Sequence, residues 1–189
     1  MRTTRPSPLS KTLALVPPAI ALVAQHASGA FAAYIKIGSI EGEATEKSHS
    51  QWIVLESMEW GVSRAISSGG GGSQVPSSPS ISELTLSKHL DKASPALFLN
   101  AVGGSGTIAT VTLELVDSAT SQVMYRLTLN DVLVSSQSNS GTAGAGSERP
   151  KETISLNFAK MKIEYFVVDA NGSTPIPAVG YDLATGKSF

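Results

Sequence analysis

The residues of this chain that could do chemistry are concentrated between positions 41 and 52. Glu41, Glu43, Glu46 and His49 provide three carboxylates and one imidazole, which are the ligand types of a mixed metal site. Their spacing matches no calcium-loop pattern, and Lys47 places a positive charge among them. We therefore interpret the stretch as a solvated polar loop in preference to a metal site, and we expect neither a metal nor another cofactor.

The histidines and glycines argue against catalysis. A nucleophilic hydrolase needs a serine activated by a histidine base; beyond residue 32 the only histidines are His49 and His89, and no serine lies in a Gly-x-Ser-x-Gly turn. The glycine runs match neither a phosphate-binding loop nor a dinucleotide-binding fingerprint. The chain has no cysteine, which excludes a disulfide framework and a thiolate nucleophile. We predict that the protein is not an enzyme, with a secreted hydrolase as the least favoured alternative.

The charge distribution argues against nucleic acid as a partner. Of the 14 basic residues, three lie within the first eleven positions, so the rest of the chain has 11 basic residues against 15 acidic ones. Phosphate binding needs concentrated positive charge, which this balance does not provide.

The elements that must position these residues are mainly strands. In "TIATVTLELVD" the apolar residues recur at every second position, which is the period of a strand with one face in a core. The segments 123–129 and 154–158 show the same alternation, with Tyr125, Leu127, Ile154, Leu156 and Phe158 pointing inward. The phase slips near Ala159 and Lys160, which predicts a bulge or a bend between two sheets.

One segment has the signals of a short helix. Ser94 is the predicted N-cap, Pro95 the first helical residue, and Gly103 and Gly104 can end the helix in a left-handed conformation. Many strands with a single helix predict a mainly β fold, a small antiparallel β-barrel of two packed sheets, closed or nearly closed, with one short flanking α-helix. The helix should cover an open end or side of the barrel with Leu97, Phe98, Ala101 and Val102.

Two stretches, 67–80 and 135–150, are rich in serine and glycine and are predicted to be flexible loops. No structure is predicted for the tail from Asp169 onward. Trp60 is predicted to pack in or beside the core. Trp52 follows the charged loop, and we predict for it a role in a subunit contact.

The first 32 residues have the three parts of a secretory signal peptide. A basic start is followed by the uncharged run "TLALVPPAIALVA" and by an A-x-A cleavage pattern. The run is too short for a permanent membrane anchor. We predict cleavage between Ala32 and Ala33, with cleavage after Ala30 as the alternative, followed by secretion to the periplasm or the extracellular space. A disordered tail, or a start site assigned too far upstream, is the other interpretation.

Several sequence blocks resemble the hemolysin-coregulated protein (Hcp) family, the tube subunits of bacterial type VI secretion systems. The blocks run from Tyr34 to Tyr165 in the order of the family. They include "YIKIGSIEGEATEKSHSQW", "EWGVSR", "LDKASP" and "ISLNFAKMKIEY". Several matching blocks in series are a stronger indication than any single one.

The resemblance implies a barrel domain over residues 33–189 that forms homohexameric rings stacked into a hollow tube. It implies that the segment after the first strand contacts the neighbouring ring, and the matching residues here are Glu43, Glu46, Lys47, His49 and Trp52. It also implies tube-tip, sheath and effector proteins as partners, with effectors in the lumen, and no catalytic residues.

The leader is a departure from the family, because its tube subunits usually begin close to the first strand. This departure keeps a second hypothesis open, in which the chain is an exported Hcp-like binding or carrier module that acts outside a type VI apparatus.

Overall fold

The structure is a computed structural model that describes residues 30–68, 74–104, 106–169 and 172–189. Residues 1–29 of the predicted signal peptide therefore lie outside the described residues. The described residues form one α-helix, α1 (Ser94–Ala101), one short 3-10 helix, η1 (Lys47–His49), and a series of strands. The strands are β1 (Phe31–Ile37), β2 (Ile53–Leu55), β3 (Ser57–Glu59), β4 (Val62–Ser63), β5 (Ile66–Ser68), β6 (Gln74–Pro76), β7 (Ser80–Ile81), β8 (Leu84–His89), β9 (Ile108–Asp117), β10 (Val123–Ser140), β11 (Lys151–Asn157), β12 (Lys160–Asp169), β13 (Gly172–Pro175), β14 (Val179–Asp182) and β15 (Lys187–Ser188).

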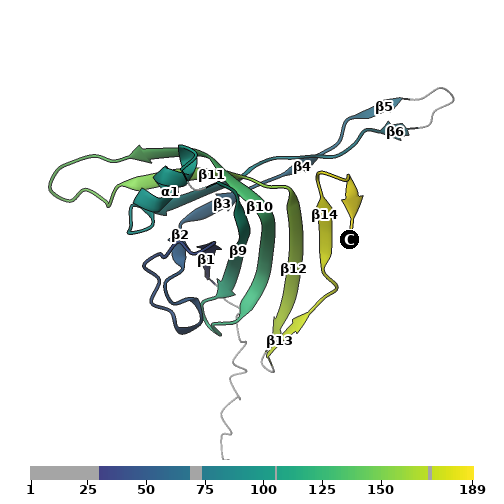
Figure 1. Ribbon diagram of the computed structural model, residues 1–189. Coiled ribbons are helices and arrows are strands. Elements are labelled where there is room, and N and C mark those ends of the chain that lie inside the picture. The colour runs from purple at the N-terminus through teal and green to yellow at the C-terminus, as the bar shows by residue number, and fades with distance from the viewer. Residues whose placement is uncertain (1–29, 69–73, 105, 170–171) are drawn as a thin grey trace, which may run out of the picture.

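The main strands pair antiparallel in two sheets that share β10 (Figure 1). One sheet has the order β2, β1, β9, β10, β12, β14, β15, and the other contains β10, β11, β8 and β3. The two-sheet packing with one helix confirms the predicted fold class. Among the described residues, however, the barrel is not closed.

The core lies between the sheets and consists of the alternating apolar residues. Leu113, Leu127, Leu129, Ile154 and Leu156 are each fully buried, as the period-two pattern predicts. Burial of this apolar surface is the main favourable contribution to folding.

The bend predicted near Ala159 lies where the two sheets meet. Strand β10 turns at Asp131, whose φ of 53° is left-handed. The backbone N–H of Ala159 donates to the Asn130 carbonyl at 3.1 Å, so the break between β11 and β12 lies opposite this turn. Because β12 pairs with the first half of β10 and β11 with the second, the bend passes the chain from one sheet to the other.

The helix is short, as predicted, but it does not have the predicted cap. Ala93 is the N-cap residue and Ser94 is the first helical residue; the Ser94 hydroxyl makes no cap hydrogen bond and bonds to Lys88 and Glu152 instead. Of the four residues predicted to cover the barrel, Leu97 is fully buried and Ala101 partly buried. The prediction is wrong for Phe98 and Val102, whose side chains are exposed to solvent and do not cover the barrel.

The two predicted loops are partly strands. Strands β5 and β6 pair with each other and, together with β4 and β7, form a ribbon that projects from the body (Figure 1). Strand β10 continues to Ser140, where it pairs with Lys151 of β11. Most side chains of these segments are exposed, so the segments lack the apolar alternation that predicts a strand, and backbone pairing defines them.

The tail beyond Asp169 also forms strands, because β13 and β14 both pair with β12 and cover its outer edge. Within the described ranges there is no helix of the length and apolar content that a membrane crossing requires.

Candidate functional site

Residues 43–52, here called the arm segment, fold back on themselves between β1 and β2. Ala44 N–H donates to the Trp52 carbonyl and Gln51 N–H donates to the Ala44 carbonyl, both at 2.9 Å. Gly42 lies at the base of the segment, where an added Cβ would stand 2.3 Å from the Trp52 carbonyl oxygen. The close backbone approach therefore requires glycine at this position.

Glu46 caps the short helix η1 within the arm segment. One of its carboxylate oxygens accepts hydrogen bonds from the backbone N–H groups of Ser48 and His49, each at 2.9 Å. The same oxygen lies 2.6 Å from Nδ1 of the His49 ring. The ring hydrogen bond, followed by the one from Ser48, lowers the pKa of the Glu46 carboxyl group below its usual range.

His49 joins the arm segment to the sheet. Its side chain is only 2 % exposed, and its Nε2 atom lies 2.7 Å from Oε2 of Glu114 on β9. The ring of Tyr34 stacks on it at a centroid distance of 4.6 Å, and the ring of Trp52 meets it edge-on at 4.8 Å. Glu114 in turn accepts a hydrogen bond from Nε of Arg126 on β10.

The five predicted arm residues thus have different environments. Glu43 and Lys47 are exposed, Glu46 and Trp52 are partly buried, and His49 is buried. Only the exposed members, and the exposed parts of Glu46 and Trp52, are available to another molecule.

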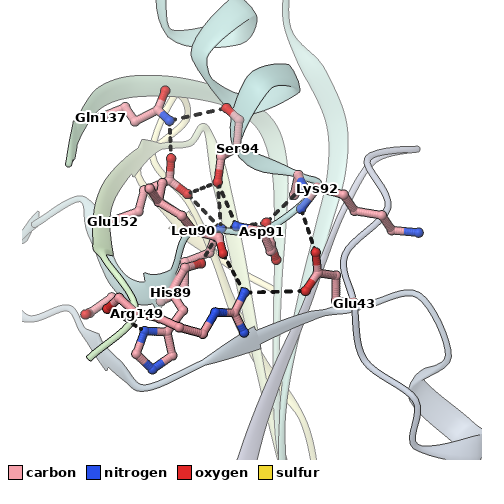
Figure 2. Close-up of polar contacts among 12 residues, drawn as sticks. Glu43, His89, Leu90, Asp91, Lys92, Ser94, Gln137, Arg149 and Glu152 are labelled. Atoms are coloured by element: carbon pink, nitrogen blue, oxygen red, sulfur yellow. Dashed lines mark hydrogen bonds and ion pairs between the residues drawn. The ribbon is translucent and has the colours of Figure 1, made fainter. Parts of the chain in front are cut away.

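Glu43 connects the arm segment to a second group of polar residues beside α1 (Figure 2). Its carboxylate accepts a hydrogen bond from the backbone N–H of Lys92 at 3.1 Å and lies 3.5 Å from Arg149. Arg149 also donates to the Leu90 carbonyl at 2.7 Å. The base of the arm segment is therefore tied to the loop that enters the helix.

A buried ionic cluster lies next to this loop. Nζ of Lys88 is 2.7 Å from the carboxylates of both Asp91 and Glu152, and the side chains of Lys88 and Glu152 have no exposed surface. Ser94 donates to Glu152 at 2.9 Å, and Gln137 donates to its other oxygen (Figure 2). The cluster joins β8, β10, β11 and the first turn of α1.

We did not predict these buried charges, but two of them have a signal in the sequence. Lys88 is in phase with Leu84 and Leu86, and Glu152 is in phase with Ile154 and Leu156, so both lie on core-facing positions. They are also directly opposite each other in the β8–β11 register. Glu114 has no such signal, because it lies out of phase with the core and its partner is 65 residues away.

The contacts of Glu43, His49 and the Lys88 cluster hold the arm segment and the first turn of α1 against the sheets. In the part of the chain that the structure describes, no group of three or more acidic or histidine side chains is placed to hold a metal ion. The carboxylates of Glu46, Glu114 and Glu152 are each occupied by a cationic or hydrogen-bonding partner.

Ala32 and Ala33, the predicted cleavage residues, lie within β1. Ala32 pairs with Val116 of β9, and Ala33 pairs with Leu115 of β9 and Leu55 of β2. Cleavage between them would leave β1 beginning at Ala33, with the pairs from Ala33 to Ile37 retained.

Comparison with known proteins gives a consistent result. The family model described as "Type VI secretion system effector, Hcp" matches residues 34–165. Protein hcp1 of Pseudomonas aeruginosa is 30% identical over 141 residues, which cover 74% of this chain and 86% of that protein.

Solved structures agree in fold. A type six secretion system protein is similar with a TM-score of 0.78 and 30% identity, over 85% of this chain and 100% of that one. Hcp1 from Salmonella typhimurium is similar with a TM-score of 0.69 and 28% identity, over 85% and 99% of the two chains.

Proposed function

This chain belongs to the Hcp family and is a type VI secretion tube subunit, and we propose that it forms homohexameric rings that stack through the arm segment. Hcp proteins are structural tube proteins and are secreted by the type VI system. The family match over residues 34–165 is the observation on which the assignment depends. Tube-tip, sheath and effector proteins are the further partners that we propose.

The conformation of the arm segment supports its role in ring contacts. The segment is held by its own backbone hydrogen bonds and by the buried His49, so little conformational entropy is lost when it meets a partner. It presents the charges of Glu43 and Lys47 to solvent beside the half-buried Trp52. A contact between this segment and a different surface of the next ring is heterologous, so stacking can continue without closing.

Lys47→Glu tests the stacking surface. Because Lys47 is exposed, reversing its charge should leave folding and rings intact and shift the population from stacked tubes to single rings. Negative-stain microscopy and sedimentation velocity measure this shift, with Lys187→Glu at the exposed strand β15 as the matched control. A protein that stays monomeric at high concentration would contradict ring assembly.

Unchanged stacking of the Lys47→Glu variant would contradict the arm assignment alone. In that case Ile66 and Val75, which are exposed on the projecting ribbon, are the next residues to replace.

We also propose that residues 1–32 are a cleaved Sec signal, which gives a mature chain of residues 33–189. N-terminal sequencing of the native protein, together with its cellular fraction, tests this proposal. A mature protein that begins at Ala33 in the periplasm supports it and favours the exported carrier module as the second candidate function. A cytoplasmic protein that still begins at Met1 contradicts it.

A further inference from the structure

His49 is held between two carboxylates. Its Nδ1 atom is 2.6 Å from Glu46 and its Nε2 atom is 2.7 Å from Glu114. An ionised carboxylate can only accept hydrogen bonds, and a neutral imidazole has a single N–H to donate. Both short contacts are therefore satisfied together when the ring is a doubly protonated imidazolium.

The groups around the ring explain why its proton matters. Glu46 faces it from η1 and Glu114 from β9, while Tyr34 and Trp52 cover it with aromatic surface. Arg126 of β10 contacts the other oxygen of Glu114, at 2.5 Å, and lies 3.9 Å from Glu164 of β12.

Loss of one proton from His49 changes both the charge and the hydrogen bonding of this buried site. Among the described residues, Glu114 would then keep its ion pair with Arg126, whereas Glu46 would lose its ion pair with His49. One ring nitrogen would also point a lone pair at a carboxylate oxygen less than 3 Å away. Breaking a buried charge-assisted hydrogen bond in this way is costly, and the arm segment can relieve the cost by moving away from β9.

We propose that protonation of His49 controls the order of the arm segment, so that the segment is held against the sheet when His49 is a cation and loosens when it is neutral. The consequence for tubes rests on the proposed function: if the arm segment makes the ring contact, stacking weakens as the pH rises.

Hydrogen–deuterium exchange of the full-length protein, measured from pH 6 to pH 9 and corrected for intrinsic exchange rates, tests the proposal. The amides of residues 44–52 should exchange about tenfold faster or more once the proton is lost, while those of β9 stay unchanged. The His89→Gln variant is the matched control, because His89 is partly exposed and outside the arm segment, and it should keep the pH step. A wild-type protein whose amides in residues 44–52 show no step in corrected exchange rate between pH 6 and pH 9 would overturn the proposal.

Glu114→Gln gives a second, directional test. The amide of glutamine can donate to an unprotonated Nε2, so this variant should keep the arm segment protected at high pH, with a smaller step. A step as large as that of the wild type would also overturn the proposal.

Sedimentation velocity over the same pH range separates this inference from the proposed function. A pH step in exchange without a change in stacking would contradict the arm segment as the ring contact, while the proposal on His49 stands. Stacking that is sensitive to Lys47→Glu but not to pH, with no exchange step, would contradict the proposal on His49 alone.

Discussion

Replacement of Lys88 by methionine should be among the most destabilising single changes in this protein. Lys88 has no exposed side-chain surface, and its ammonium group lies 2.7 Å from Asp91 and 2.7 Å from Glu152. Methionine has a similar volume but leaves the two carboxylates without their cation, and Glu152 is fully buried. Breaking a buried ion pair by removing one partner costs about 3–5 kcal/mol. For a chain of this size that loss lowers the melting temperature by about 6–20 °C.

The assay is thermal and urea unfolding followed by circular dichroism. Protein concentrations are kept equal because the proposed ring assembly would contribute to the apparent stability. Lys92→Met is the matched control: Lys92 is 43% exposed and pairs with the 59% exposed Glu41, and such surface pairs contribute about 0–1 kcal/mol.

The double variant Lys88→Met with Glu152→Met should lose less stability than the sum of the two single variants, because it removes both charges of the pair. Additive losses, or a Lys88→Met variant as stable as Lys92→Met, would refute the reasoning.

Two further predictions concern the arm segment and the core. Gly42→Ala should lower the free energy of unfolding by about 1–3 kcal/mol, because the added Cβ would collide with the backbone of Trp52 and Ile53. Gly61→Ala is the control in the same unfolding assay, since its added Cβ would meet only Ser82, at 4.0 Å. Burial raises the pKa of Tyr125, with an opposing hydrogen bond from Trp60. The folded state thus favours the neutral phenol. Its contribution to the free energy of unfolding is present below about pH 10, the ordinary pKa of tyrosine, and is lost as the pH rises further. Tyr125→Phe should therefore lose less stability than the wild type between pH 9 and pH 11; an equal loss would show that Tyr125 does not contribute.

The sequence predicts those strands in which successive side chains point alternately to the core and to solvent. The alternation in β9, β10 and β11 predicts both the strands and their buried faces, and the phase slip near Ala159 predicts the bend between the sheets. The alternation does not predict β5 and β6, whose side chains are all exposed, or the end of β10, whose side chains are polar and mostly exposed; backbone hydrogen bonds specify these strands. The N-cap prediction for Ser94 is also wrong: serine is a common N-cap residue, but here its hydroxyl bonds to Lys88 and Glu152.

The candidate site shows the same division. The residue types between 41 and 52 by themselves determined that this is a polar segment without a metal-binding or catalytic pattern, and the order of sequence blocks determined the family. Only the tertiary structure decided that His49 is buried, because its second carboxylate comes from Glu114, on a strand 65 residues further along the chain. A local pattern cannot specify such a contact, since the pairing of β1 with β9 determines which side chains meet across the sheet.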